Sequence, residues 1–139
     1  MNNLGTRSVG TRSVEIKSYK DLSVWKKGFQ LSLLVYRSTK LFPKEELYGL
    51  VSQMRRCAIS IPSNIAEGYT RHRKLEYVQF LQISFASGAE LETQVLIARE
   101  LEYLDEADFE EVYYLMQELQ RMLNSLISKV KTSAYSPNA

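Results

Sequence analysis

The stretch from residue 109 to residue 130 places an apolar side chain at every third or fourth position, and this repeat limits the folds open to the chain. It consists of Phe109, Val112, Met116, Leu119, Leu123, Leu126 and Val130. In an α-helix this spacing puts the side chains on one face, and a strict repeat is typical of helices that cross at a small angle. We therefore expect a helix that begins after Asp105, a suitable N-cap, and packs along other helices.

Three further stretches have helical periodicity. We expect helices over about Asp21–Lys40, with its first residue as N-cap, over about Lys44–Glu67, and over about Arg71–Tyr103, with Thr70 as N-cap. Gly68 is expected to stop the second helix. The long third helix has two apolar stripes, so it needs two partners, one in its own bundle and one that another subunit could supply. Since no strand-like alternation is visible, the sequence predicts an all-α protein, an antiparallel four-helix bundle in up-down-up-down order.

The chain has 139 residues, which is the size of one domain. Near its start the pentapeptide GTRSV occurs twice in tandem, and such a polar, glycine-containing repeat is too short to form a core. We expect a flexible arm over residues 1–18, the bundle over residues 19–131 and a disordered tail over residues 132–139.

A proline, Pro62, lies inside the second helical pattern, in the stretch MRRCAISIPSNIAEGY. Proline removes one backbone hydrogen bond and crowds the carbonyl four residues earlier. Because the apolar seam keeps its phase on both sides, we predict one kinked helix, with Ser60, Ser63 and Asn64 satisfying the freed carbonyls. Asn64 either fixes register or partner choice from a buried position, or turns to the loop.

The sequence is poor in the residues of catalytic and metal sites. It contains one histidine, His72, beside two arginines, and one cysteine, Cys57, on an apolar stripe where a buried thiol is expected. The carboxylates Glu67, Glu90 and Glu92 lack the Glu-x-x-His pairs of di-metal bundles, and we expect Glu67 and Glu90 to cap backbone groups or pair with arginines. We therefore predict no enzymatic activity, no metal and no cofactor.

Charge is divided unevenly along the chain although the net charge is only +2. Residues 1–74 hold 14 Lys and Arg against 5 Asp and Glu, whereas residues 75–139 hold 4 against 11. We predict that Tyr69 stacks on a base and that a basic set binds the phosphates of RNA or DNA. This set consists of Lys26, Lys27, Arg55, Arg56, Arg71, Arg73 and Lys74.

Two other interpretations of the same residues stay open. The basic half can pair with the acidic half, within one chain or between subunits. The apolar stripes and nine tyrosines can instead form an interface of an oligomeric scaffold that binds a protein partner. No apolar run is long enough to span a bilayer and no secretory signal is visible, so with a single cysteine we expect a cytoplasmic protein without membrane contact.

The motif SIPSNIAEGY, residues 60–69, resembles the signature of a bacterial family of small proteins encoded in intervening sequences of 23S rRNA genes, often labelled S23 ribosomal proteins. The resemblance extends over residues 19–131 and includes the stretch FLQISFASGAELETQVLIARELEYL. Ala86 and Ser87 stand where the family usually has Gly and then Ser, and Gly88 stands where a larger residue is common. The motif residues that carry the resemblance are Ser60, Pro62, Asn64, Glu67, Gly68, Ser87, Glu90 and Glu92.

This resemblance implies a four-helix bundle without enzymatic activity that assembles into ring-like homopentamers. The family is also similar to the accessory proteins of diversity-generating retroelements, which are basic pentameric barrels that bind nucleic acid and a reverse transcriptase. We therefore expect a homo-oligomer, with a pentamer favoured, that binds RNA or other nucleic acid.

Overall fold

The computed structural model describes residues 15–133, and within this range the chain forms four long helices and no strand. The four are α1 (Ser23–Ser38), α2 (Ser52–Thr70), α3 (Lys74–Glu100) and α4 (Glu106–Thr132). Shorter helical turns are η1 (Tyr19–Asp21), η2 (Lys44–Glu46) and η3 (Leu47–Val51). The predicted all-α four-helix bundle is therefore confirmed. The expected arm and tail lie mostly on residues 1–14 and 134–139, which are outside the described range.

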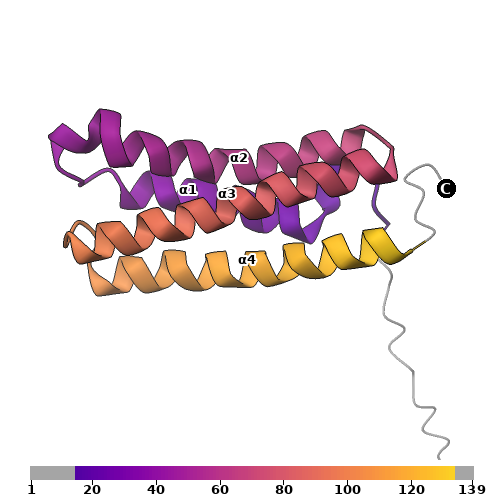
Figure 1. The fold of residues 1–139 in the computed structure, drawn as a ribbon. Helices are drawn as coiled ribbons and strands as arrows, with labels where there is room; N and C mark the ends of the chain where they lie inside the picture. The colour runs from indigo at the N-terminus through magenta and orange to yellow at the C-terminus, as the bar shows by residue number, and fades with distance from the viewer. Residues whose placement is uncertain (1–14, 134–139) are drawn as a thin grey trace, which may run out of the picture.

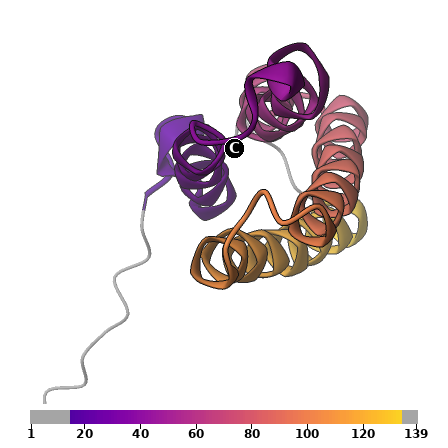
Figure 2. The ribbon, with the colours of Figure 1, turned by 90° about the vertical axis from the view of Figure 1, so that its left-hand side faces the viewer.

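Each helix packs against its neighbours in the chain, and α1 also packs against α4. Consecutive helices run in opposite directions (Figure 1), and the four lie around a common centre when the bundle is viewed along its length (Figure 2). Two contacts show which ends meet. Lys74 at the start of α3 donates a hydrogen bond to the carbonyl of Ser133 after α4, and Arg99 near the end of α3 pairs with Glu106 at the start of α4.

The core is built from one face of each helix. Its fully buried side chains include Leu31 of α1, Met54 and Ile61 of α2, and Tyr77 and Leu91 of α3. On α4 the predicted repeat is buried from Phe109 to Val130 except at Leu126, which is half-buried while the neighbouring Ile127 is buried. A straight helix drifts against a seven-residue repeat, and this drift moves the buried position by one residue in the last two turns.

The N-cap predicted for α1 is wrong. Asp21 belongs to η1, where its carboxylate accepts the backbone N–H groups of Lys17 and Ser18 at 2.9 and 3.1 Å. Ser18 caps the same turn with its hydroxyl, which completes a capping box. Helix α1 begins after Leu22, which makes no side-chain capping bond. The expected cap at Asp105 is confirmed, because its carboxylate accepts the N–H of Asp108 at 2.7 Å.

Gly68 does not stop the second helix, which continues to Thr70. Gly68 is buried where α2 crosses α3, and a Cβ atom at this position would lie 2.6 Å from the Cβ of Phe80. The glycine therefore serves the close approach of two helices rather than a chain reversal. Thr70 does not cap α3 either, because its hydroxyl donates to the carbonyl of Glu67. Helix α3 begins at Lys74 without a side-chain cap.

The second helical pattern is interrupted near its start. Gly49, inside η3, has φ −108° and ψ −112°, which lie outside the helical region. The helical conformation is therefore interrupted at this residue. The carboxylate of Glu46 accepts the N–H of Leu50 at 3.1 Å and replaces a partner that the interruption removes. The sequence does not predict this interruption at Gly49; the change of direction that it predicts is at Pro62.

Helix α2 runs through Pro62 as a single helix, but the freed carbonyl is not satisfied by the residues we expected. The Ala58 carbonyl, which lies four residues before the proline, accepts the hydroxyl of Ser32 on α1 at 2.9 Å. One turn further on, the Ile61 carbonyl accepts the hydroxyl of Ser84 on α3 at 2.9 Å. Ser63 is exposed and makes no such bond. Both neighbouring helices therefore support α2 around the proline.

The remaining motif residues join α2 to α3. The hydroxyls of Ser60 and Ser87 are 2.9 Å apart and share one hydrogen bond. The Nδ2 of Asn64 donates to the Ser60 carbonyl at 2.7 Å and to the Ser60 hydroxyl at 2.9 Å. Asn64 is half-buried and its side chain lies back along α2, so the alternative in which it turns to the loop is wrong.

Candidate nucleic-acid interface

Cations gather at the end of the bundle where α1 begins, α2 ends, α3 begins and α4 ends. We call this set the basic pole, and within residues 15–133 it consists of Lys17, Lys20, Lys26, Arg71, Arg73, Lys74, Lys129 and Lys131. The segments meet because neighbouring helices run in opposite directions (Figure 1). The contact of Lys74 with Ser133 and the packing of η1 on α2 both lie at this end.

The opposite end of the bundle carries an excess of carboxylates. They are Glu45, Glu46, Glu100, Glu102, Asp105, Glu106, Asp108 and Glu110. Each end also holds charges of the other sign: Arg37, Lys40, Lys44, Arg55, Arg56 and Arg99 at this end, and Glu15, Asp21, Glu67 and Glu76 at the basic pole. The uneven charge of the two halves of the sequence thus becomes, in part, a separation of charge along the length of the bundle. Such a distribution gives the two ends potentials of opposite sign, which direct polyanions to one end.

Some of the predicted phosphate-binding residues at the basic pole or next to it already have partners. The guanidinium of Arg71 pairs with Glu67 at 2.9 Å, as expected for this carboxylate, and also lies over the ring of Phe80. Lys27 pairs with Glu118 of α4 at 3.3 Å. In contrast, Lys26 and Arg73 are exposed and form no ion pair with the described residues. Exposed pairs are weak, so a phosphate can displace the carboxylate from Arg71.

Arg55 and Arg56 do not join the basic pole, because they lie in the first turns of α2, at the other end of that helix. The guanidinium of Arg55 stands over the ring of Tyr36 at 4.6 Å and donates to the Thr39 hydroxyl at 3.0 Å. These contacts hold the end of α1 against α2, so Arg55 has a structural role here. Arg56 is exposed beside it, near Tyr48.

Tyr69 lies at the basic pole but its ring faces other rings. It packs edge-on against Tyr77, with the ring centroids 6.0 Å apart, and against His72 at 6.4 Å. Tyr69 is half-buried and packs against the core, so part of its side chain is not available to a base. His72 has φ +57°, an uncommon backbone conformation for a non-glycine residue, in the turn that ends α2.

The sequence reasoning missed half of the basic pole. Lys17 and Lys20 precede α1, and Lys129 and Lys131 stand in the last turns of α4, in the half of the chain that is acidic as a whole. The signal was present in the order of the elements, since an up-down bundle brings the end of its fourth helix beside the start of its first and third. The net negative charge of residues 75–139 hides the two lysines at the end of α4.

The remaining candidate residues lie near the middle of the α2–α3 contact. Burial raises the pKa of the Cys57 thiol to about 11, and the nearby carboxylate of Glu90 adds to the rise. Gln94 donates to the Cys57 sulfur at 3.5 Å, and Glu92 accepts from Gln117 at 3.3 Å. Among residues 15–133 no group of three or more His, Cys, Asp or Glu side chains is placed to hold a metal ion.

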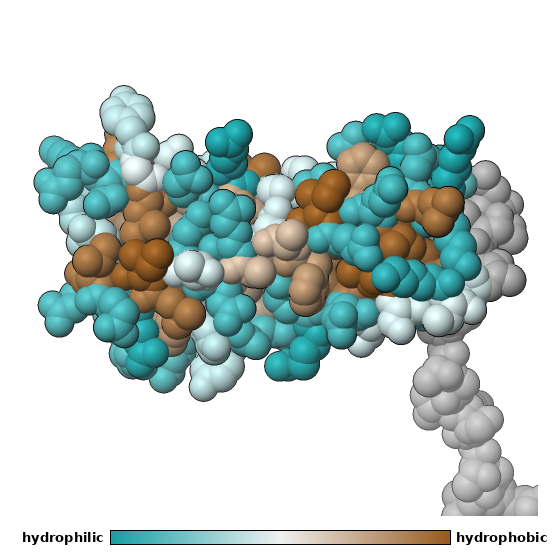
Figure 3. Space-filling view, viewed as in Figure 1, coloured by the Kyte–Doolittle hydropathy of each residue, from teal (hydrophilic) through white to brown (hydrophobic). Residues whose placement is uncertain are grey.

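No helix among the described residues is both long and apolar enough to cross a membrane. Apolar side chains are nevertheless exposed on the outside of the bundle. Figure 3 shows hydrophobic side chains gathered on the left of the face seen in Figure 1, where α3 ends. In this region Leu96, Ile97 and Leu101 are between 39% and 50% exposed.

Comparison with known proteins places this fold in a family. The profile of the 23S rRNA-intervening sequence protein family matches residues 20–125. A solved structure of a protein with unknown function from the S23 ribosomal protein family of Bacteroides thetaiotaomicron is similar, with a TM-score of 0.70 and 20% identity over 76% of this chain and 96% of that chain. No curated protein matches. Because the profile covers the greater part of the bundle, the chain belongs to the 23S rRNA-intervening sequence protein family.

Proposed function

We propose that the protein is a non-catalytic, cytoplasmic homo-oligomer that binds structured RNA, or another nucleic acid, through its basic pole. The observation that carries the proposal is the gathering of five exposed cations at one end of the bundle, from η1, α1, α4 and the turn before α3: Lys20, Lys26, Arg73, Lys129 and Lys131. Nucleic-acid backbones are recognised by such cations, and the binding weakens steeply with salt. The resemblance to the basic accessory proteins of retroelements supports the same function.

Two separate apolar surfaces support the homo-oligomer. One, the α1–α2 face, includes Phe29, Leu33 and Ile59, each between 42% and 50% exposed, around a hollow of about 350 Å³. The other, the α3 face, includes Ile97 and Leu101. The two faces belong to different helices, which lie on different sides of the bundle (Figure 2), so contact between the two faces would be heterologous. Heterologous contacts close into a ring when the rotation between subunits allows it and otherwise form open filaments, and the ring is the form that agrees with the pentamer favoured by the family resemblance.

The nucleic-acid proposal is tested by neutralising exposed cations at each end in turn. We expect Lys20→Ala/Arg73→Ala/Lys131→Ala to weaken binding of a labelled structured RNA, and to lower the slope of log Kd against log salt by about 2 to 3, since each of the three lost phosphate contacts removes about 0.7 to 0.9. Fluorescence anisotropy over a salt series measures both quantities. A DNA duplex of matched length, treated in the same way, reports which nucleic acid is preferred.

The matched control removes the same number of charges at the acidic end, as Arg37→Ala/Lys40→Ala/Lys44→Ala. All three residues are exposed, and we expect RNA affinity within about twofold of the wild type, because these cations stand among carboxylates. Equal losses in the two variants would mean that net charge alone matters and would remove the assignment to the basic pole. Absence of binding at low salt would overturn the proposal itself.

An oligomeric scaffold that binds a protein partner without nucleic acid is the second candidate. The observation that favours it is the amount of apolar surface left exposed outside the core, from Phe29 and Leu33 on α1 to Ile83 and Leu101 on α3. A protein that forms the ring but ignores RNA at all salt concentrations would fit this function.

A further inference from the structure

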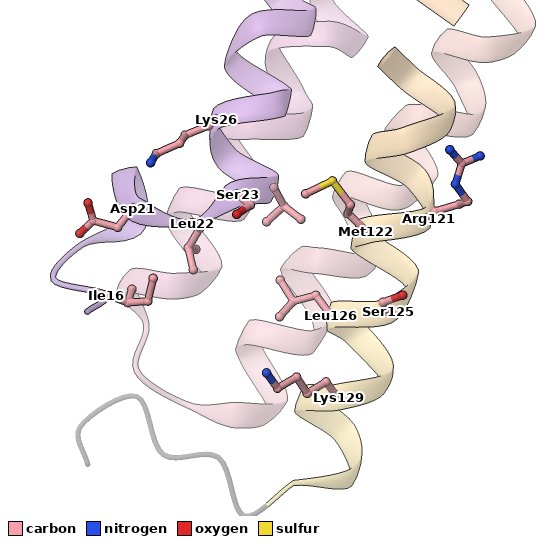
Figure 4. Close-up of a pocket in the computed structure, with 11 residues that line it drawn as sticks. Ile16, Asp21, Leu22, Ser23, Lys26, Arg121, Met122, Ser125, Leu126 and Lys129 are labelled. Carbon is pink, nitrogen blue, oxygen red and sulfur yellow. The ribbon is translucent and has the colours of Figure 1, made fainter. Parts of the chain in front are cut away.

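A groove of about 570 Å³ lies between the start of α1 and the second half of α4. Its lining comes from the segment before α1, from η1 and the first turns of α1, and from α4 (Figure 4). The groove belongs neither to the α1–α2 face nor to the α3 face. Its volume is within the usual range of ligand sites, but it is open along one side, as a site for an elongated occupant would be.

The floor of the groove is apolar. Ile16 and Leu22 face Met122 and Leu126 across the space between the two elements (Figure 4). Ile16 is 42% exposed, and Leu22, Met122 and Leu126 are only half-buried. Four apolar side chains in the groove are therefore partly exposed to water. Covering this surface is favourable for any occupant with an apolar stripe.

The rim of the groove is cationic. Lys26 from α1, with Arg121 and Lys129 from α4, line it; the side chains of Lys26 and Arg121 extend outward on opposite sides of the groove (Figure 4), and none of the three forms an ion pair with the residues described. Lys129 extends toward the α1 side at one end of the groove (Figure 4). The one acidic residue, Asp21, is committed to the N–H groups of Lys17 and Ser18, which lower the pKa of its carboxyl group. The occupant that complements this rim is an anion.

The shape favours an α-helix over a small amphiphile. The groove runs beside α4, from Arg121 to Lys129, which corresponds to about two helical turns. A helix laid between two helices buries its apolar stripe in the floor and keeps its flanks in water, the common helix-in-groove arrangement. A lipid chain would leave most of its length uncovered in a site open on one side.

We propose that this groove binds an amphipathic helix of a partner protein, with an apolar stripe of i, i+3, i+4, i+7 spacing flanked by Asp and Glu. The chain itself offers no better occupant. Residues 1–14 carry two arginines and no acid, and residues 134–139 carry no acidic side chain. The exposed acidic face of α4 in a second copy presents Tyr114 beside Glu110 and Glu111, without an aliphatic stripe for the floor.

The test uses a fluorescein-labelled helical peptide with leucine at the stripe positions, glutamate beside them and alanine elsewhere. We expect the full-length protein to bind it, and the variant Lys26→Glu/Lys129→Glu to bind about tenfold more weakly, because one charge is reversed on each side of the groove. The matched control is Lys20→Glu/Lys131→Glu. It reverses two cations of the same pole that do not line the groove, and we expect peptide affinity within about twofold of the wild type.

A second pair of variants tests the floor without changing charge. Ser125 is exposed and lines the groove between Met122 and Leu126, whereas the neighbouring Asn124 is exposed and does not line it. We expect Ser125→Trp to fill the groove and reduce peptide binding about tenfold, and Asn124→Trp to leave it unchanged. A peptide with lysine in place of glutamate should not bind.

Several results would overturn the proposal. One is equal peptide binding by the groove variants and their controls, and another is equal binding of the lysine peptide. If the groove variants change the sedimentation of the protein but not its peptide affinity, the groove is a contact with a second copy of the chain. If they lose only the binding of the protein to vesicles of phosphatidylcholine and phosphatidylserine, the groove is a membrane contact. RNA binding should fall similarly in both lysine pairs, since both belong to the basic pole, so failure of the nucleic-acid proposal is seen separately.

Discussion

Around Pro62, a side chain of a neighbouring helix supplies the hydrogen-bond donor that the proline lacks. Ser32 satisfies the Ala58 carbonyl from α1, and Gly28 allows α1 to come close, since a Cβ there would lie 3.3 Å from the Cβ of Pro62. An unpaired buried carbonyl would cost about 1–3 kcal/mol, so the proline is tolerated in α2 because α1 supplies a donor. From the sequence we placed this donor on α2 itself, because local spacing contains no information about which residue faces it from another helix.

Ser32→Ala should lower the free energy of unfolding by about 1–2 kcal/mol, because it leaves the Ala58 carbonyl without its donor. Urea denaturation followed by circular dichroism measures the change. Ser63→Ala, at an exposed position on α2 without a hydrogen bond, serves as the control. In a Pro62→Ala background the backbone N–H returns, so Ser32→Ala should then cost much less. An equal cost in both backgrounds would contradict the role of Ser32.

At the scale of the element, helix existence could be read from the sequence but helix ends could not. The apolar periods predict all four helices, because burial of one face is encoded residue by residue. The end of α2 was misplaced because Gly68 is also what a close helix crossing requires, and that crossing depends on Phe80 in another element. In the candidate site, too, some residues could be predicted from the sequence and others depend on the arrangement of the helices. Lys26 and Arg73 could be predicted, whereas Lys129 became a candidate only once the helices were arranged.

Helix α3 ends without the glycine that usually marks a helix C-terminus in a sequence. Glu102 has φ +62°, the N–H of Glu102 donates to Arg99, and the N–H of Tyr103 donates to Ala98. This is the Schellman arrangement, with glutamate at the left-handed position where glycine is usual. Since its side chain strains the backbone and its charge lies at the negative end of a helix dipole, Glu102 is a poor choice for local stability.

Glu102→Gly should therefore raise the free energy of unfolding by about 1 kcal/mol. The matched change Glu100→Gly, inside the last turn of α3, removes the same charge at a helical position and should lower it by about 0.5–1 kcal/mol. Both are measured by urea denaturation. Destabilisation by both variants to the same extent would show that the left-handed backbone at Glu102 is not strained.

At the scale of the whole molecule, the two apolar faces make the proposed ring testable. Leu33→Glu places a charge in the α1–α2 face and Ile97→Glu places one in the α3 face. Each variant alone should sediment as a smaller species than the wild type, because every interface in a heterologous ring uses both faces. Leu41→Glu is the control, since Leu41 is 94% exposed and lies on neither face.

Mixing the two variants gives the sharper result. Each keeps one intact face, so one productive contact forms and the mixture should contain heterodimers but no rings. Sedimentation velocity distinguishes these species. Rings restored by mixing would contradict a contact between the α1–α2 face and the α3 face, and wild-type assembly by both single variants would show that neither face is used.

The separation of charge along the bundle has a consequence for any closed assembly whose symmetry axis runs along the helices. Every subunit would then present its cationic end on the same side of the disc, and its carboxylates on the other. Binding of a polyanion would become multivalent, because several weak contacts act at a high effective concentration and their combined avidity far exceeds that of one subunit. Assembly itself would then switch nucleic-acid binding on, and dilution below the assembly threshold would switch it off without any change at the contact residues.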